Sequence, residues 1–318
     1  MTVGGRYPAL RGAKDDTNGG PLDATPSYRS GLIALAGRPN VGKSTLANAL
    51  SGAHVAAVSS RAQTTRRRIS AVVHGDDWQA VLQDMPGYQT PRDALTERMQ
   101  RTVDQTLGDC DAVLFVVNAE EAIGGGDRFV AERVRATGRP AVIVVNKTDA
   151  VHPDRIARGI TQAVELLPDF TAVHPISALT GDGLEGLRNE LRALLPEGPP
   201  YFPADQPTDQ THDERASELI REAAIQRLRD EVPHALAVVV EEVGAERGRV
   251  RVTASVLVDH ESQKGIVVGS GGQMIRDIGT AARSSLTEAW GTPVHLDLTV
   301  KVRRGWRQDD AMLNRLGL

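Results

Sequence analysis

A glycine-rich segment that ends in lysine and serine is the strongest chemical signal in the chain. Residues 37–44 read GRPNVGKS, which fits G-x-x-x-x-G-K-S, and they lie between an apolar run typical of a strand and a segment typical of a helix. Such a loop folds into a nest of backbone N–H groups around phosphates, and the helix N-terminus adds its positive dipole end. Lys43 would reach the β- and γ-phosphates, and the Ser44 hydroxyl would bind Mg²⁺. The alternative is a strand-to-helix turn without a ligand, which the combination of pattern and context disfavours.

An aspartate and a glycine follow the expected strand at residues 80–83, in the segment Asp84-Met-Pro-Gly87. An aspartate beside a phosphate-binding loop can hold Mg²⁺, and the Gly87 N–H can contact the γ-phosphate. Taken alone, D-x-x-G is a common turn. Its position relative to residues 37–44 favours the functional interpretation.

A third group of polar residues, Asn146-Lys-Thr-Asp149, follows the apolar run at residues 141–145. A buried carboxylate at Asp149 can accept hydrogen bonds from two adjacent N–H groups of guanine, a pair of donors that adenine lacks. Residues 177–179, Ser-Ala-Leu, follow a further expected strand and would offer a backbone N–H to the guanine oxygen. Since ligands of open α/β sheets bind at the carboxyl ends of strands, these groups predict a guanine nucleotide site. The residues expected to bind GTP or GDP are Gly37, Arg38, Pro39, Asn40, Val41, Gly42, Lys43, Ser44, Thr45, Asp84, Met85, Pro86, Gly87, Asn146, Lys147, Asp149, Ser177, Ala178 and Leu179.

Strands and helices alternate over residues 31–195, which predicts a doubly wound α/β domain with a mostly parallel sheet. Residues 1–30 have no hydrophobic period and are predicted to be a disordered head. Residues 196–214 hold five prolines and no Lys or Arg, as in an extended acidic linker. Residues 215–303 predict a smaller α+β domain with mostly antiparallel strands, and residues 304–318 a basic C-terminal tail.

Composition excludes several classes of protein. The chain has 318 residues, enough for two domains, and 37 basic against 41 acidic residues, so bulk charge does not attract nucleic acid. Its single cysteine, Cys110, excludes an internal disulfide and a cysteine-based zinc cluster. No apolar run reaches the length of a membrane span, and we expect a cytoplasmic protein.

With these motifs in order, the sequence resembles the translation-factor class of GTPases, and the Era family in particular. The resemblance rests on GRPNVGKSTL at residues 37–46, QTTR at 63–66, YFPADQ at 201–206 and ESQKGIVVG at 261–269, and it covers about residues 30–303. It implies a monomeric GTPase with a C-terminal type II KH domain, which binds small-subunit ribosomal RNA and acts in assembly of the 30S subunit.

The resemblance also assigns residues to hydrolysis and metal binding. In the family the region from Gln63 to Arg66 is the first switch, and one of Thr64 and Thr65 binds Mg²⁺ when GTP is present; which one stays open. Asn40 matches an asparagine with which potassium-stimulated relatives hold K⁺. The residues expected to act in hydrolysis are Lys43, Thr64, Thr65 and Gly87, and the expected metal ligands are Ser44, Thr64, Thr65 and Asp84.

Three features near the expected hydrolytic site depart from common patterns or carry no role. Met85 stands where the family usually has threonine. Tyr88 stands where Ras-type enzymes have a water-orienting glutamine, but the relatives carry an apolar residue there, so hydrolysis without glutamine is expected. The arginine run at 66–68 is interpreted as a solvated face rather than as a source of an arginine finger.

A second glycine cluster, Gly269-Ser-Gly-Gly272, fits the G-x-x-G loop with which KH domains approach the backbone of RNA. The alternative is a plain turn between helices. Ser270 replaces a usual lysine, which removes a phosphate contact and weakens the salt dependence of binding. The residues expected to contact RNA are Lys264, Gly269, Ser270, Gly271, Gly272 and Arg276.

The basic run near the C-terminus allows two interpretations. Lys301, Arg303, Arg304 and Arg307 surround Trp306, and this group would either hold RNA by charge and stacking or form a solvated tail with a packed tryptophan. The rival function for the whole chain is a GTP-gated membrane or cell-cycle signalling protein, which would make peripheral contact with the inner face of the membrane.

Overall fold

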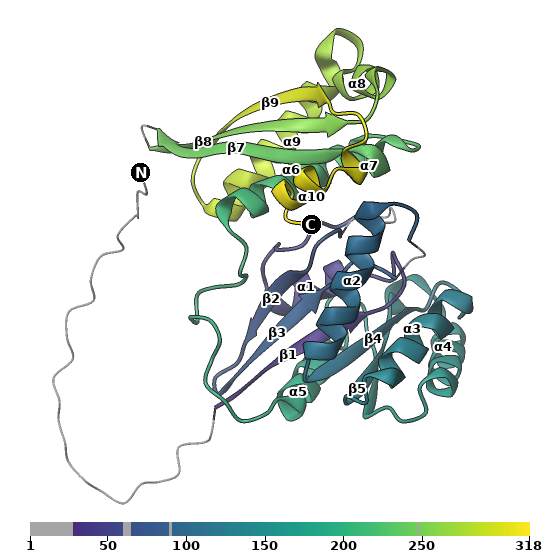
Figure 1. Ribbon diagram of the computed structural model, residues 1–318. Helices are drawn as coiled ribbons and strands as arrows, with labels where there is room; N and C mark the ends of the chain where they lie inside the picture. The colour runs from purple at the N-terminus through teal and green to yellow at the C-terminus, as the bar shows by residue number, and fades with distance from the viewer. Residues whose placement is uncertain (1–27, 60–64, 89–90, 247) are drawn as a thin grey trace, which may run out of the picture.

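The structure is a computed structural model, and it describes residues 28–59, 65–88, 91–246 and 248–318 (Figure 1). The predicted head at 1–30 lies outside this part except for its last three residues. Of these, Arg29 already begins the first strand.

A six-stranded sheet carries the first domain, in the order β2-β3-β1-β4-β5-β6. All neighbouring strands are parallel except β2, which runs antiparallel to β3. The strands are β1 Arg29–Ala36, β2 Ile69–His74, β3 Trp78–Asp84, β4 Ala112–Asn118, β5 Ala141–Asn146 and β6 Ala172–Pro175. The predicted doubly wound, mostly parallel sheet is confirmed.

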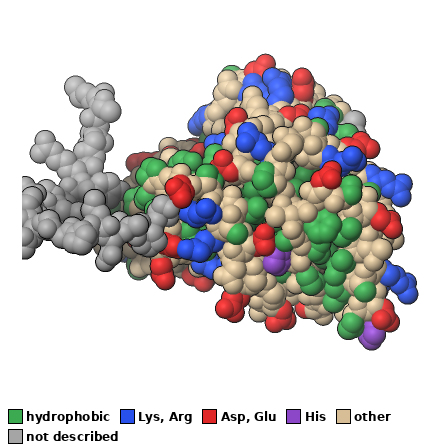
Figure 2. Space-filling view, turned by 90° about the horizontal axis from the view of Figure 1, so that it is seen from below, with side chains coloured by type: hydrophobic (Ala, Val, Ile, Leu, Met, Phe, Trp, Pro, Cys, Tyr) green, Lys and Arg blue, Asp and Glu red, His purple; other side chains and the backbone are tan. Residues whose placement is uncertain are grey.

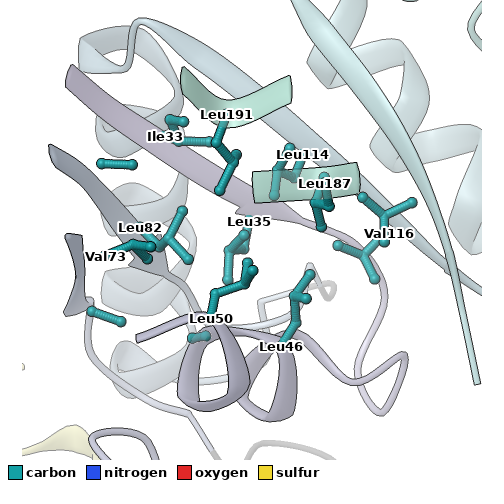
Figure 3. Close-up of a cluster of buried hydrophobic side chains, with 14 of the residues drawn as sticks. Ile33, Leu35, Leu46, Leu50, Val73, Leu82, Leu114, Val116, Leu187 and Leu191 are labelled. Carbon is teal, nitrogen blue, oxygen red and sulfur yellow. The ribbon is translucent and has the colours of Figure 1, made fainter. Parts of the chain in front are cut away.

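Helices cover both faces of this sheet. Leu46 and Leu50 of α1 pack with Leu187 and Leu191 of α5 on one face (Figure 3), whereas α2, α3 and α4 cover the other. Strands β4 and β5 are buried along their whole length because both faces are covered. The helices are α1 Lys43–Ser51, α2 Ala94–Asp109, α3 Gly125–Ala136, α4 Pro153–Leu166 and α5 Leu184–Leu194, with a 3-10 turn, η1, at Thr148–Ala150.

The proline-rich linker follows the first domain before it enters the second. Gln79 of β3 accepts hydrogen bonds from the backbone N–H groups of Tyr201 and Phe202 and donates one to the Phe202 carbonyl. The linker ends earlier than residue 214, because Thr211 caps α6, and Glu214 returns the bond to Thr211 in a capping box.

The second domain has a three-stranded sheet with helices α6 and α9 packed on one face. Strands β7 and β8 are antiparallel, but β8 and β9 are parallel, so the prediction of mostly antiparallel strands was wrong. The chain between β8 and β9 passes through two helices, and this crossover returns it to the same end of the sheet. The elements are α6 His212–Arg227, α7 Val232–Ala235, β7 Ala237–Glu246, β8 Arg249–Val258, α8 Glu261–Val268, η2 Ser270–Gly272, α9 Gln273–Trp290 and β9 Val294–Val302.

The C-terminal residues fold between the two domains instead of forming a tail. They form η3 at Trp306–Gln308 and α10 at Asp310–Arg315, which lies between the second domain and the end of α2 (Figure 1). Trp306 is fully buried in a cluster with Leu95 and Met99 of α2 and with Leu313. This apolar cluster joins the domains.

One face of the molecule carries charges of both signs. Basic and acidic side chains are interspersed over the face in Figure 2, in keeping with a net charge of -4. Across the described parts of the chain, every helix is too short or too polar to cross a bilayer.

Candidate nucleotide site and nucleic-acid interface

The phosphate-binding loop links the central strand β1 to helix α1, as predicted. Gly42 has a φ of 97°, a conformation that residues with a side chain rarely adopt. A side chain on Gly37 would lie 2.5 Å from the Val116 carbonyl oxygen, so only glycine fits there. Lys43 is buried, and its Nζ donates to the carbonyls of Gly37 at 3.0 Å and Arg38 at 2.8 Å. This burial lowers the pKa of Lys43 to about 8.

Three oxygen-bearing side chains converge at the carboxyl end of β3. Ser44 Oγ lies 2.6 Å from Asp84 Oδ2, and Thr65 Oγ1 lies 3.0 Å from Ser44 Oγ and 3.2 Å from Asp84 Oδ2. Asp84 Oδ1 is buried without a hydrogen-bond partner among the described residues, and burial raises the pKa of this carboxyl. Oxygen ligands suit Mg²⁺, so this group fits the metal that the sequence implies. Thr64 lies outside the described residues.

Of the residues after Asp84, one lies against the phosphate-binding loop and two are buried in the core. A side chain on Gly87 would lie 2.8 Å from Pro39, so Gly87 lies against the phosphate-binding loop and needs to be glycine. Met85 instead packs in the core. Tyr88 is also buried, and its hydroxyl donates to Asp104 of α2 at 2.7 Å, which directs the phenol toward α2.

The expected guanine-binding residues meet beside the same loop. Asn146 Nδ2 donates to the Val41 carbonyl at 2.9 Å, and Asn146 Oδ1 accepts from the Ala178 N–H at 3.0 Å. Ser177 Oγ donates to Asp149 Oδ1 at 2.5 Å. Asp149 is exposed, not buried as predicted, which leaves its carboxylate accessible to a base.

Two further expected residues follow Asn146 and Ala178 in the chain. Lys147 has a φ of 65°, its Nζ lies 2.9 Å from Glu120, and it lines the cavity described next. Leu179 is 78% exposed.

A cavity of about 360 Å³ opens over the phosphate-binding loop. Four lining residues were not predicted: Ala57, Val58, Ser59 and Glu121. The first three lie in irregular chain without a sequence motif, and the only signal for Glu121 was the acidic pair after β4. Arg38 is held on the α3 side by Asp127 at 2.8 Å and Glu121 at 2.9 Å. The predicted residues that line the cavity are Pro39, Asn40, Gly42, Lys43, Ser44, Thr45, Thr65, Gly87 and Lys147.

The second glycine cluster forms the tight turn between α8 and α9. Gly269, Gly271 and Gly272 have φ values of 71°, 56° and 77°, all in the left-handed region. A side chain on Gly271 would meet open space, so the loop presents bare backbone to solvent. Arg276 is exposed beside this loop. A Cβ on Gly272 would lie 3.1 Å from the Arg276 guanidinium.

The other predicted RNA contacts also lie near this turn. Ser270 is exposed in the turn itself, and Lys264 lies half-buried on α8. The structure therefore brings the predicted RNA contacts to one end of the second domain, away from the nucleotide cavity.

Known proteins resemble the chain over nearly its whole length. The family model described as 50S ribosome-binding GTPase matches residues 32–147, and the KH domain model matches residues 231–307. GTPase Era of Mycobacterium tuberculosis is 46% identical over 297 residues, which cover 91% of this chain and 99% of that protein. GTPase Era of Mycobacterium avium is 44% identical over 295 residues, with the same coverage. The chain belongs to the Era family of GTPases.

Two solved structures agree with this assignment. The crystal structure of an Aquifex aeolicus Era variant bound to GDP and AlF4⁻ has a TM-score of 0.88 and 34% identity, covering 91% of this chain and 99% of that one. Era in complex with MgGDPNP and nucleotides 1506–1542 of 16S ribosomal RNA gives the same values. The chain is therefore a GTP hydrolase with an α/β G domain followed by a KH domain.

The arginine run of this Era-family GTPase is not a solvated face, contrary to the prediction. Arg66 is 4% exposed and donates to the carbonyls of Leu236 at 2.6 Å and His234 at 2.9 Å in the second domain. Arg67 pairs with Glu214 and Glu218 of α6 at 3.3 and 3.4 Å. Only Arg68 is exposed. Sequence alone could not show this, since the partners of Arg66 are backbone carbonyls about 170 residues away in sequence.

The C-terminal basic run of the KH domain is also engaged within the protein. Trp306 Nε1 donates to the Ala235 carbonyl at 2.9 Å, and the ring is fully buried, so the interpretation that it stacks on RNA was wrong. Lys301 pairs with Glu241 at 2.6 Å. Arg303 pairs with Asp309 at 2.7 Å, and Arg307 with Asp93 of the G domain at 2.6 Å. Arg304 stays exposed.

Proposed function

We propose that this Era-family GTPase binds small-subunit ribosomal RNA through its KH domain and acts in assembly of the 30S subunit. The observation that carries the proposal is the bare turn at residues 269–272, in a chain that aligns over 91% of its length with an Era structure holding 16S ribosomal RNA. Glycines at this turn let a phosphate backbone approach more closely than any side chain would allow.

We further propose how the G domain binds and hydrolyses GTP. Backbone N–H groups of residues 38–44 surround the phosphates, and Lys43 shifts its ammonium from the loop carbonyls to the β- and γ-phosphate oxygens. Ser44, Thr65 and Asp84 supply the oxygen atoms that hold Mg²⁺, and of the two candidate threonines the contacts favour Thr65. Mg²⁺, when bound, neutralises charge that develops on the phosphates. Gly87 offers its N–H near the γ-phosphate, where no side chain intervenes.

The base is selected on the other side of the loop. The Asp149 carboxylate accepts from the two adjacent guanine N–H groups, and Ser177 orients that carboxylate through their 2.5 Å hydrogen bond. Asn146 links the phosphate-binding loop to Ala178, so the positions of phosphates and base are set by one side chain.

The first switch makes the KH domain respond to whether GTP or GDP is bound to the G domain. Thr65 lies at the proposed metal site, and the next residue, Arg66, is bound to the KH domain. When Thr65 changes position on GTP binding, Arg66 moves with it, and the contact between the two domains changes. The position of the glycine turn relative to the G domain then changes as well.

Potassium dependence, a monomeric state, a cytoplasmic location and a peripheral membrane fraction stay predictions. Asn40 supports the first, because it lines the nucleotide cavity in a left-handed conformation with a φ of 66°. GTP turnover measured in KCl and in NaCl at equal concentration tests the potassium dependence. Equal rates in the two salts would contradict a K⁺ site.

Crosslinking in cells, followed by sequencing of the bound RNA, tests the proposed function. The native protein should enrich small-subunit over large-subunit ribosomal RNA. A variant with Gly271→Asp and Gly272→Asp should lose that enrichment while it still hydrolyses GTP. Equal recovery of both ribosomal RNAs by the native protein would contradict the proposal.

A further inference from the structure

A second large cavity lies between the two domains, apart from both sites described above. Its volume is about 640 Å³, within the range of cavities that hold small molecules. Its walls come from α2, the chain before β2, the end of the linker, α6 and the C-terminus. Four arginines line it: Arg66, Arg67, Arg68 and Arg98.

Arg66 lacks a charged partner in this cavity wall. Its guanidinium NH groups donate to backbone carbonyls only, its Nε has no hydrogen-bond partner, and no carboxylate lies within ion-pair distance among the described residues. The carboxylates of Glu218 and Asp93 act on its charge only from beyond ion-pair distance. A guanidinium that is 4% exposed and makes no ion pair is costly to bury, and an anion beside it would reduce that cost.

Two more side chains on the cavity wall have unused polar atoms. Arg68 is exposed and makes no ion pair or side-chain hydrogen bond with the described residues, whereas Arg67 and Arg98 are both paired. Gln210 has its Nε2 and Oε1 both buried without hydrogen-bond partners among the described residues, so the amide NH2 and the amide oxygen are both unused.

Carboxylates also line the cavity, and they narrow the class of ligand. Glu214 is paired with Arg67, and Asp209 accepts a hydrogen bond from Ser70 Oγ at 2.7 Å, but Asp109 has no such partner among the described residues. Carboxylates repel a bare phosphate but accept hydrogen bonds from hydroxyl groups. A ligand with both phosphate and hydroxyl groups therefore matches these walls better than an inorganic anion.

We propose that this interdomain cavity binds a small phosphorylated sugar or nucleoside. Arg68 holds the phosphate beside the buried charge of Arg66, and the Gln210 amide, which is buried in the free protein, turns toward a hydroxyl or amide of the ligand. Since Arg66 also binds the KH domain and adjoins Thr65, the bound ligand strengthens the contact between the first switch and the KH domain.

Calorimetric titration with ribose 5-phosphate tests this proposal. The protein is first saturated with Mg²⁺ and GDPNP, so that the phosphate-binding loop is already occupied. The native protein should bind about one equivalent of ribose 5-phosphate, more tightly than it binds inorganic phosphate. Arg68→Ala and Gln210→Leu should each weaken this binding by about tenfold or more, since each removes a hydrogen-bonding group.

Arg158→Ala is the matched control, because Arg158 is exposed on α4, far from the cavity wall, and the charge change is the same. It should leave the affinity unchanged. Each variant should still bind one equivalent of GDPNP, which verifies that it is folded. Arg68→Gln repeats the test with a side chain that is longer than alanine but carries no charge. No saturable binding by the native protein, or equal binding by the Arg68 and Gln210 variants, overturns the proposal.

Discussion

Thr65 and Arg66 are neighbours in the chain, but their side chains serve different domains. Thr65 Oγ1 lies 3.2 Å from Asp84 Oδ2 at the proposed metal site, whereas Arg66 donates to the Leu236 carbonyl at 2.6 Å. The Arg66 guanidinium also lies 5.5 Å from the centre of the Trp306 ring, within the apolar cluster that joins the domains. A displacement of the first switch therefore cannot leave the domain interface unchanged.

Arg66→Ala should destabilise the folded protein. It leaves the buried Leu236 carbonyl without its donor, which costs about 1–3 kcal/mol in the free energy of unfolding, whereas the His234 carbonyl keeps a donor in Arg307. Urea unfolding of the nucleotide-free protein measures this loss. Arg68→Ala is the matched control, since the neighbouring arginine is exposed and should change stability by no more than about 0.5 kcal/mol. Equal effects of the two variants would mean that Arg66 does not hold the interface.

Asp149→Asn should change the preferred base from guanine to xanthine. The amide cannot accept from both guanine N–H groups, so GTP affinity should fall by about 100-fold or more. Xanthosine triphosphate should gain affinity, because its exocyclic oxygen accepts from the new amide. Competition against a fluorescent guanine nucleotide measures both. If the native protein bound ATP as well as GTP, Asp149 would not be the selector.

Tyr88→Phe should leave GTP turnover within about threefold of the native rate, because the phenol donates to Asp104 and is directed toward α2. Lys43→Ala, in contrast, removes the ammonium from the phosphates and should abolish most binding or turnover. Steady-state phosphate release measures the two variants under the same conditions. Comparable losses would show that Tyr88 acts in hydrolysis.

Nucleotide binding should take up protons above pH 8. The pKa of Lys43 is lowered to about 8 by burial, and bound phosphates favour the charged ammonium, which raises this pKa. Binding therefore takes up almost no proton at pH 6.5 and close to one at pH 9, and affinity falls as the pH rises through 8. Calorimetry in buffers of different ionisation enthalpy measures the uptake. Equal proton uptake at pH 6.5 and pH 9 would show that Lys43 is not the group that titrates.

The nucleotide site was predictable because its signals are local. The phosphate-binding loop, Asp84 and Asn146 each follow an apolar strand, and the carboxyl ends of parallel strands meet at one edge of the sheet. The sequence order of the motifs therefore predicted their assembly in space. The glycine turn at 269–272 was predictable for the same reason, since its conformation depends on residues next to each other in the chain.

The domain interface was not predictable, because its partners are distant in sequence. Arg66 binds backbone carbonyls that any sequence would offer, and the burial of Trp306 depends on Leu95 and Met99, which lie about 200 residues earlier. A run of arginines beside a switch resembles a solvated face until the second domain is placed against it. The parallel pairing of β9 likewise depends on the two-helix crossover and not on the pattern within the strand.

Binding of small-subunit ribosomal RNA by the glycine turn is tested most directly by one double variant, Gly271→Asp with Gly272→Asp. Aspartate tolerates the left-handed conformation better than most residues, and the two charges would repel phosphates at the turn.

Gly108→Asp with Gly125→Asp is the control, because it adds the same charge at two open positions of the G domain. Filter binding to a small-subunit ribosomal RNA fragment and fluorescence titration with GDPNP are measured on one preparation of each protein. The double variant at the turn should lose at least about 100-fold in RNA affinity and keep its GDPNP affinity, whereas the control should keep both. Undiminished RNA binding by the variant at the turn would contradict RNA binding by the glycine turn.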